Sequence, residues 1–296
     1  MKRNFLSAII MLLVSWSVAL AQQPYASTAE DIALAEILFA DLNSDAGRKT
    51  GPELLVRAAL AQLGQDYVAN TQEGPEEKLR IHLTRTDCIL FVDNTLALVR
   101  TVQQYRAGAT FEHLAELLEP MRYDDARRAE GFAPYATRVH YVTEWIARGE
   151  AQGVFRNLSD ELGGEADPRP VSFMSAHPDS YAPLSGESDY AKRNRRDISR
   201  MEAFVNTLPR SVVPRERIAA AEGEIRSGDI LCFATSIDAL DYSHVVIAYR
   251  AKAGDPLTFI HASSSARKVI VEPRPLRDYL QAYSKISGIT VLRLNK

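Results

Sequence analysis

Cysteine is scarce in this chain: only two of its 296 residues, Cys88 and Cys232, carry a thiol. So few cysteines exclude a small scaffold held by several disulfides, and a chain of this length can bury a core without one. Two interpretations are open, a single disulfide or a reactive thiol with a buried partner. Because Cys232 lies in an apolar, strand-like run, the position of Cys88 decides between them.

Long basic runs and, beyond residue 21, long apolar runs are also missing. The 35 basic and 38 acidic residues leave a net charge of −3, and no block of Lys and Arg suits a nucleic-acid partner. No later segment stays apolar over the roughly 18 residues that a membrane span needs. We therefore expect neither nucleic acid as a partner nor a membrane span in the mature chain.

The start of the chain has the pattern of a secretory signal. A charged beginning precedes a mostly apolar stretch over residues 6–20, and Ala19-Leu20-Ala21 fits an A-x-A cleavage site. We predict that residues 1–21 are a cleaved signal peptide. The mature chain, 22–296, is then secreted or periplasmic.

The hydrophobic spacing changes from helical to strand-like late in the chain. Turn signals between the late strands favour antiparallel pairing. We predict an α+β fold, with one domain over 22–296 whose helical N-terminal half packs on a C-terminal antiparallel sheet. The expected helices are 28–45, 52–63, 88–105, 111–118 (ended by Pro120), 137–148, 189–207 and 275–283. The expected strands are 229–235, 243–250, 257–262, 268–272 and 289–294, with one extended piece at Val171–Met174 in an otherwise irregular region, 150–187.

Cys88 opens an apolar stripe of helical spacing. Residues 88, 91, 92, 95, 96 and 99 fall on one face of a helix, so the sulfur points toward whatever that helix packs against. The first turn of a helix has free N–H groups and the positive end of the dipole, which lower the pKa of a thiol. We therefore predict that Cys88 is a nucleophile, with Asp87 or Thr86 as the N-cap.

Two histidines lie on neighbouring strand-like runs. His244 begins one run and His261 ends the next, so antiparallel pairing brings both imidazoles to one end of the sheet. A nucleophilic thiol needs an imidazole as base, and that imidazole needs a second polar group to orient it. We assign His244 as the base and His261 as the orienting residue.

The same three residues, Cys88, His244 and His261, could also be zinc ligands with water as the fourth. Ligand pairs at the short spacing typical of zinc sites are absent from the sequence. We therefore expect no metal and no other cofactor.

The order of several short motifs resembles the NlpC-type cell-wall cysteine hydrolases and, more closely, the bacterial N-acetylmuramoyl-L-alanine amidase-like family. The similarity covers nearly all of 50–296. The motifs are Gly64-Gln65-Asp66-Tyr67-Val68-Ala69-Asn70-Thr71, Asp87-Cys88-x-x-Phe91-Val92, Arg138-Val139-His140-Tyr141 with Trp145, Phe173-Met174-Ser175, Gly228-Asp229-Ile230, Leu240-Asp241-x-Ser243-His244-Val245 and His261-Ala262-Ser263.

The resemblance implies a papain-like fold with a triad of Cys88, His244 and His261. It also implies cleavage of the amide between N-acetylmuramic acid and L-alanine, in peptidoglycan or in muropeptides. Ile89 departs from the Ser, Thr or Val usual after the nucleophile, and Val246 from a common glycine. Neither departure removes a member of the triad.

Four further residues are candidates for substrate binding. Tyr67 corresponds to a cleft residue of the NlpC-type enzymes, although a tyrosine after a helix stop also suits a core. Arg138, His140 and Tyr141 could bind a carboxylate or a sugar, because Arg offers a bidentate fork. The competing interpretation is a solvated Arg138 beside a core Tyr141.

Three other functions are open from the sequence. One is an endopeptidase that cuts the stem peptide next to D-glutamate with the same triad. Another is a non-catalytic peptidoglycan-binding protein in which Cys88 is inert. The third is a metal-dependent hydrolase.

Overall fold

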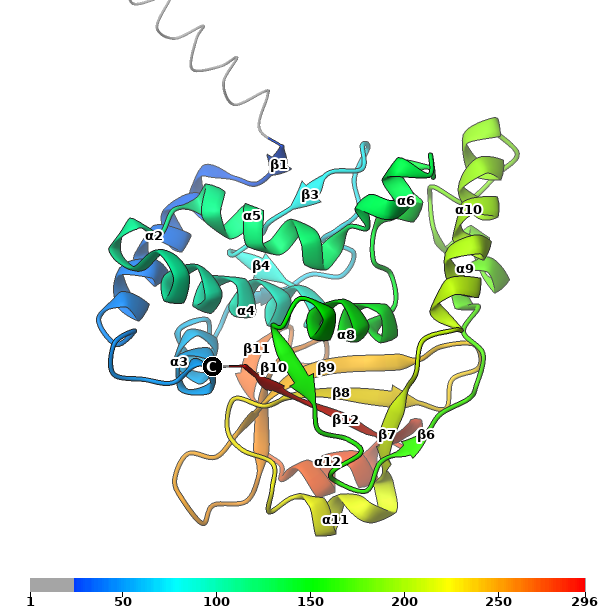
Figure 1. Ribbon diagram of the computed structural model, residues 1–296. Coiled ribbons are helices and arrows are strands. Elements are labelled where there is room, and N and C mark those ends of the chain that lie inside the picture. Colours follow the sequence, from blue (N-terminus) through cyan, green and yellow to red (C-terminus); the bar gives the residue numbers. More distant parts are fainter. Residues whose placement is uncertain (1–23, 296) are drawn as a thin grey trace, which may run out of the picture.

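The change of hydrophobic spacing along the sequence corresponds to two structural layers, helices followed by a curled sheet (Figure 1). The computed structural model describes residues 24–295, so the predicted signal peptide lies outside the described residues. Within that part, no helix is both long and apolar enough to cross a bilayer. The helices are α2 (Ala29–Asn43), α3 (Gly51–Ala61), α4 (Cys88–Tyr105), α5 (Phe111–Arg122), α6 (Asp125–Ala129), α7 (Pro134–Thr137), α8 (Val142–Ala151), α9 (Phe173–Ala176), α10 (Asp189–Val205), α11 (Ile218–Ala221) and α12 (Leu276–Ala282).

The main sheet has ten strands. Eight of the nine pairs for which a register is defined are antiparallel, and the exception joins β2 to β4. Its order is β4-β2-β11-β10-β9-β8-β12-β7-β6, with β5 also paired to β12, while β1 and β3 form a separate parallel pair. The strands are β1 (Tyr25–Ala26), β2 (Asp66–Tyr67), β3 (Leu79–Arg80), β4 (Arg85–Thr86), β5 (Phe155–Asn157), β6 (Glu165–Ala166), β7 (Ser211–Pro214), β8 (Ile230–Thr235), β9 (Tyr242–Tyr249), β10 (Thr258–Ser263), β11 (Lys268–Val271) and β12 (Ile286–Leu294).

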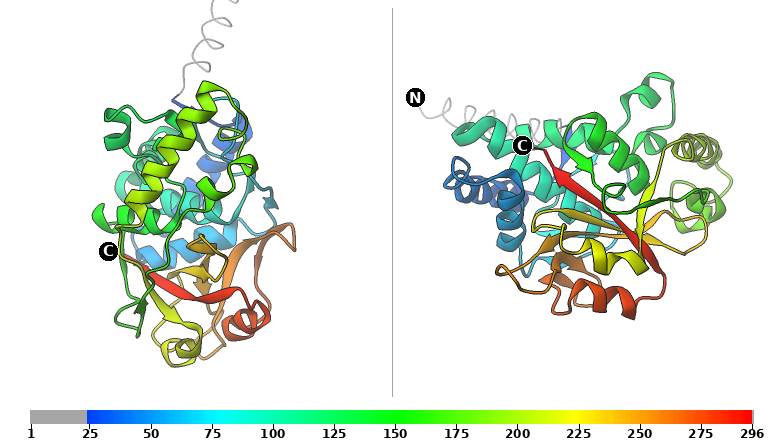
Figure 2. Two further views of the ribbon diagram at one scale, coloured as in Figure 1. Left: turned by 90° about the vertical axis from the view of Figure 1, so that its right-hand side faces the viewer. Right: turned by 60° about the horizontal axis from the view of Figure 1, so that its bottom comes forward.

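The predicted α+β fold is therefore confirmed, and α4 spans the predicted 88–105. Helix α4 packs on β9 and β10 and is surrounded by α2, α3 and α5. Figures 1 and 2 show this group on one face of the sheet and α11 and α12 on the other. Alternate strand residues serve the two faces: Cys232 and Val245 face α4, whereas Phe233 and Phe259 join the core beneath α12.

Three departures from the predicted elements have an identifiable physical cause. Helix α5 continues through Pro120, which lies in the last turn, where its missing N–H costs a single helical bond. Helix α8 begins at Val142 instead of 137, because Asp241, distant in sequence, accepts the Thr143 N–H at 2.8 Å. The extended piece predicted at Val171–Met174 is wrong, since α9 begins at Phe173.

The cause of that third difference is a buried carboxylate. Glu202 of α10 accepts the N–H groups of Met174 and Ser175 at 3.1 Å each. These donors belong to the first turn of α9 and have no partner within the helix. A distant side chain thus favours a helical turn that local sequence does not indicate.

Two glycines with the same backbone angle offer a matched test of the packing between α3 and the sheet. Gly228 and Gly254 both have φ +89°, but a Cβ on Gly228 would lie 2.4 Å from the carbonyl oxygen of Pro52, whereas one on Gly254 meets nothing within 4 Å. We predict that Gly254→Ala costs roughly 1–2 kcal/mol of unfolding free energy from the backbone angle alone. Gly228→Ala should cost about 1–3 kcal/mol more.

Urea unfolding of both variants measures this difference. Equal losses for the two variants would contradict the close approach of Pro52 to Gly228.

Candidate active site

The first turn of α4 is fixed by its N-cap. Asp87 accepts the N–H of Leu90 at 3.0 Å through one carboxylate oxygen and the hydroxyl of Thr71 at 2.9 Å through the other. This confirms Asp87 as the N-cap, one of the two predicted candidates. The cap places Cys88 as the first helical residue, partly exposed, with its backbone N–H free of helical bonds.

Strands β9 and β10 separate where Cys88 approaches the sheet. Their ladder ends at the pair Ile247–Ile260. The Ala248 N–H donates to the carbonyl oxygen of Asp229, which immediately precedes β8. Because successive N–H groups of a strand point to opposite sides, the N–H of Val245, three residues earlier, points toward β10. Beyond the end of the ladder, that N–H lies beside the Cys88 sulfur instead.

The thiol differs from the sequence expectation in its acidity. Burial, and next the Asp87 carboxylate, raise the pKa of Cys88 to about 12. The N–H groups of Val245 and of the helix start act in the lowering direction, as predicted, but they are outweighed. Within the described residues, no hydrogen bond joins the thiol to either imidazole. The resting thiol is therefore neutral.

The two imidazoles lie together, as the strand register requires. His244 Nε2 and His261 Nδ1 are 2.7 Å apart, a distance at which one nitrogen donates a proton to the other. Burial, then the neighbouring His261, lowers the pKa of His244 to about 3, and burial, then Arg274, lowers that of His261 to about 4. Both rings are neutral near pH 7, which leaves His244 Nδ1 as the nitrogen not used by the pair.

A cavity opens beside these rings, here called the histidine cavity. Its walls also include Tyr279 and Tyr283 from the far side of the sheet. Phe259 and Tyr279 pack edge-on against the His261 ring, at centroid distances of 4.9 and 6.1 Å. The cavity is lined by Ser243, His244, His261, Ser263, Ser264, Ser265, Tyr279, Tyr283, Lys285 and Ile286.

A second cavity, here called the arginine cavity, is formed partly by residues at the start of α4. Both neighbours of Cys88, Asp87 and Ile89, line it. So do three of the predicted substrate-binding residues, Arg138, His140 and Tyr141. The structure thus brings these three together in a cavity that also contains both sequence neighbours of Cys88.

The polar ends of those residues are already engaged within the protein. Arg138 is 3% exposed and donates to the Gln72 carbonyl at 2.8 Å and to Glu73 at 2.5 Å. His140 Nε2 lies 2.8 Å from the Tyr135 carbonyl oxygen, and burial lowers its pKa well below the usual value.

Tyr141 is engaged in the same way, because its hydroxyl donates to Glu202 at 2.6 Å. Tyr67, the fourth predicted residue, lies near Cys88 and Asp87: burial is the first cause of its raised pKa, and proximity to these two residues is the next. A role in substrate binding remains a prediction for all four.

One residue of the site was missed from the sequence. Glu272 follows β11, is 3% exposed, and places Oε2 3.5 Å from His261 Nε2. It stands opposite Phe259, whose carbonyl accepts its N–H, and so it is a diagonal neighbour of His261 on the same face. The sequence does contain a signal for it: a glutamate ends the predicted strand, 268–272, that follows the strand of His261.

The arrangement bears on the zinc and disulfide alternatives. Both cysteines are free thiols. No group of three or more His, Cys, Asp or Glu among residues 24–295 is placed to hold a metal ion. Two imidazole nitrogens on one tetrahedral zinc would be about 3.3 Å apart, whereas those of His244 and His261 are at the hydrogen-bond distance of 2.7 Å.

The chain is similar to a described protein family and to several solved bacterial structures. A family model described as N-acetylmuramoyl-L-alanine amidase-like matches residues 57–289. The crystal structure of an N-acetylmuramoyl-L-alanine amidase from Bacteroides uniformis is 28% identical over 83% of this chain and 99% of that chain, with a TM-score of 0.73. No curated protein matches the chain significantly.

Two further structures are similar. A proposed xylanase from Bacteroides fragilis is 27% identical over 81% of this chain and all of that chain (100%), with a TM-score of 0.71. A Legionella pneumophila protein is 15% identical over 90% and 95% of the two chains, with a TM-score of 0.65, and supports the fold alone.

The low pKa values of the histidine pair predict a specific loss of stability in acid. Below pH 6.5 the unfolded chain binds protons at His244 and His261, but the folded chain does so only near pH 3 to 4. Folding then releases protons, so stability falls as the pH falls through that window, by about 1.4 kcal/mol per pH unit for each fully displaced proton.

Replacing His244 by Gln removes one of the two sites at which the unfolded chain binds a proton that the folded chain does not. Urea unfolding at pH 6 and pH 5 should show a smaller loss for His244→Gln than for wild type, by roughly 1 kcal/mol. Identical pH slopes would contradict a neutral, buried His244.

Proposed function

Because the chain belongs to the N-acetylmuramoyl-L-alanine amidase-like family, we propose that it is a cysteine-dependent amidase that cleaves the bond between N-acetylmuramic acid and L-alanine. The carrying observation is the hydrogen-bonded pair of His244 and His261 at the end of the sheet on which the Cys88 helix packs. The family supplies the amidase chemistry and the peptidoglycan substrate class. The residues supply the means of cleaving an amide.

The neutral resting state favours proton transfer during attack over a preformed ion pair. As the Cys88 sulfur forms a bond to the lactyl carbonyl carbon, its proton passes to His244 Nδ1. The imidazolium is stabilised by the neighbouring His261, and the backbone N–H groups at the start of α4 face the developing oxyanion. A low imidazole pKa makes His244 a weak base but a strong acid for the next step.

The tetrahedral intermediate formed by this attack first collapses to a thioester, which water then hydrolyses. The carbon–nitrogen bond breaks, and His244 returns its proton to the departing amine of L-alanine, which leaves a muramoyl thioester on Cys88. Water attacks that thioester while His244 takes its proton. The sugar acid is released, and the proton returns to the thiol.

The fold placement within the NlpC-type, papain-like enzymes belongs to this proposal. Its support is the combination of a helix-start cysteine with a strand histidine and a second histidine as orienting group. The order of these three along the chain, Cys88, His244 and His261, also agrees with it.

A glycosidase is the function suggested by the Bacteroides fragilis relative. Such enzymes use two carboxyl groups, one of which protonates the glycosidic oxygen. The carboxylates that line the arginine cavity are already paired: Glu73 with Arg138, Asp93 with Arg122 at 2.6 Å, and Asp87 with the start of α4. The amidase is therefore the better-supported function.

Replacing Cys88 by Ala should lower kcat/KM at least about a thousandfold, because the nucleophile is lost. The assay is mass spectrometry of a muramoyl peptide after digestion. Free sugar acid and a peptide beginning with L-alanine identify the amidase, whereas a shortened stem identifies the endopeptidase alternative.

The matched control is Cys232→Ala, which removes the buried thiol of β8. This variant should hydrolyse the muramoyl peptide at the wild-type rate. Wild-type turnover by Cys88→Ala would contradict thiol catalysis. Turnover that a chelator abolishes in the wild-type protein would instead favour a metal-dependent hydrolase.

We also propose export, on the charged start, apolar stretch and A-x-A site of residues 1–21. The full-length chain expressed in a bacterial host should be recovered outside the cytoplasm with Gln22 as its first residue. N-terminal sequencing of fractionated cells measures this. A cytoplasmic protein that retains Met1 would contradict export.

A further inference from the structure

We propose that Glu272 is a positioning residue that sets the tautomers of both histidines, and so frees His244 Nδ1 to take the Cys88 proton. This inference rests on the proposed function. It adds a fourth residue behind the Cys88, His244 and His261 triad.

The geometry places Glu272 at the end of the imidazole pair. His261 Nδ1 is used by His244, and its Nε2 is a buried nitrogen with no hydrogen-bond partner within the described residues. The nearest opposite charge is Glu272 Oε2, 3.5 Å away, slightly beyond hydrogen-bond length. A buried N–H facing a carboxylate at this distance is favoured over a buried lone pair facing it.

Glu272 itself is held from the other side. Its Oε1 accepts from Arg274 twice, from the side-chain Nε at 2.5 Å and from the backbone N–H at 3.3 Å. The Arg274 guanidinium in turn lies over the rings of Tyr279 and Tyr283, at 4.7 and 5.5 Å from their centroids. These contacts fix which oxygen faces Arg274 and which faces His261.

The proton positions then follow one from another. The Glu272 carboxylate can only accept hydrogen bonds, so His261 carries its proton on Nε2 and presents a lone pair at Nδ1. His244 must therefore donate from Nε2 across the 2.7 Å contact. A neutral His244 protonated on Nε2 has a free lone pair on Nδ1, the nitrogen that acts as base.

Glu272→Gln should reverse the proton positions on both histidines with little change in side-chain shape. The two Arg274 donors hold the amide oxygen, so the amide NH₂ is turned toward His261 Nε2. That nitrogen must then accept, its proton moves to Nδ1, and His244 Nε2 becomes an acceptor. The His244 proton is left on Nδ1, where it blocks proton transfer from Cys88.

The experiment combines kinetics with nitrogen-15 NMR of the histidine rings in the full-length mature protein. In wild type, both rings should be protonated on Nε2. In Glu272→Gln, both should be protonated on Nδ1, and kcat for a muramoyl peptide should fall roughly 10- to 100-fold with KM within about twofold.

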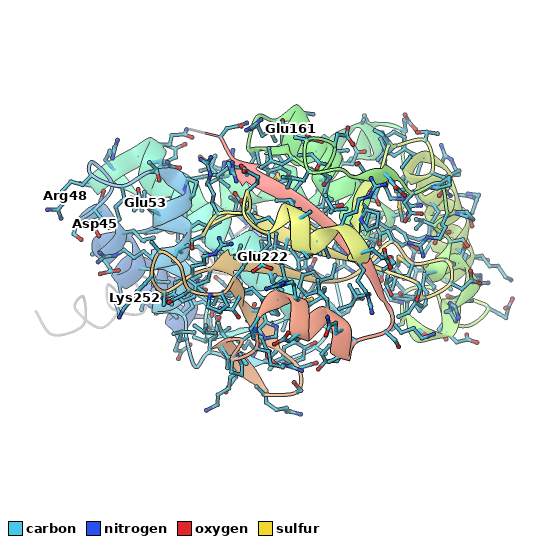
Figure 3. The ribbon with its side chains drawn as sticks, turned by 90° about the horizontal axis from the view of Figure 1, so that it is seen from below. Asp45, Arg48, Glu53, Glu161, Glu222 and Lys252 are labelled. Atoms are coloured by element: carbon cyan, nitrogen blue, oxygen red, sulfur yellow. The ribbon has the colours of Figure 1, made fainter. Side chains whose placement is uncertain are left out.

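The matched control is Glu222→Gln. Glu222 is another arginine-paired glutamate, 2.8 Å from Arg277, and lies on the lower face of the molecule (Figure 3). Within the described residues, no hydrogen bond or ion pair joins it to His244 or His261. It should retain wild-type kcat and wild-type tautomers.

Three results would overturn the positioning role: an Nδ1 proton on His261 in wild type, wild-type kcat in Glu272→Gln, or a loss of kcat with unchanged tautomers. The wild-type spectrum decides the first even where the variant folds poorly. The failure of the proposed function looks different, since it would appear as turnover by Cys88→Ala whatever the tautomers of the histidines.

Discussion

The contact between His244 Nε2 and His261 Nδ1 is the interaction on which the rest of the site depends. It requires β9 and β10 to be neighbours, and it lies just beyond the point where their ladder ends. It occupies one nitrogen of His244 and leaves the other, Nδ1, for the role of base in the proposed mechanism. The opening between the two strands also lets the first turn of α4 reach the sheet. One hydrogen bond thus links strand register to the proton transfer that we propose.

Burial sets the electrostatics of this site more than dipoles do. The start of α4 offers free N–H groups, but desolvation and Asp87 raise the pKa of Cys88 to about 12. The same desolvation lowers the pKa of His244 to about 3. A neutral thiol beside a neutral imidazole costs less in a dry site than a separated ion pair. In the proposed mechanism, charge then develops only when a substrate carbonyl is present for the sulfur to attack.

Local sequence patterns predict the elements that carry the chemistry. The stripe from Cys88 to Tyr105 gives α4 with both ends correct, because apolar spacing, N-cap and packing agree there. The strands that carry His244 and His261 are predicted within one residue at each end for the same reason. The amidase-like family is also identifiable from the order of short motifs.

Features decided by distant residues could not be predicted. The pKa of Cys88 depends on how deeply the sulfur is buried, which no spacing reveals. Helix α8 starts where Asp241 caps it, and α9 forms where Glu202 accepts its N–H groups. The place of Glu272 behind His261 requires the pairing of β10 with β11 to be known first.

The most direct test of thiol catalysis is the stoichiometry of inactivation by iodoacetamide, followed by peptide mapping. Hydrolysis of the muramoyl peptide should be lost in direct proportion to alkylation of Cys88, while the buried Cys232 stays unmodified. A preparation in which Cys88 is fully alkylated and turnover persists would contradict the central claim.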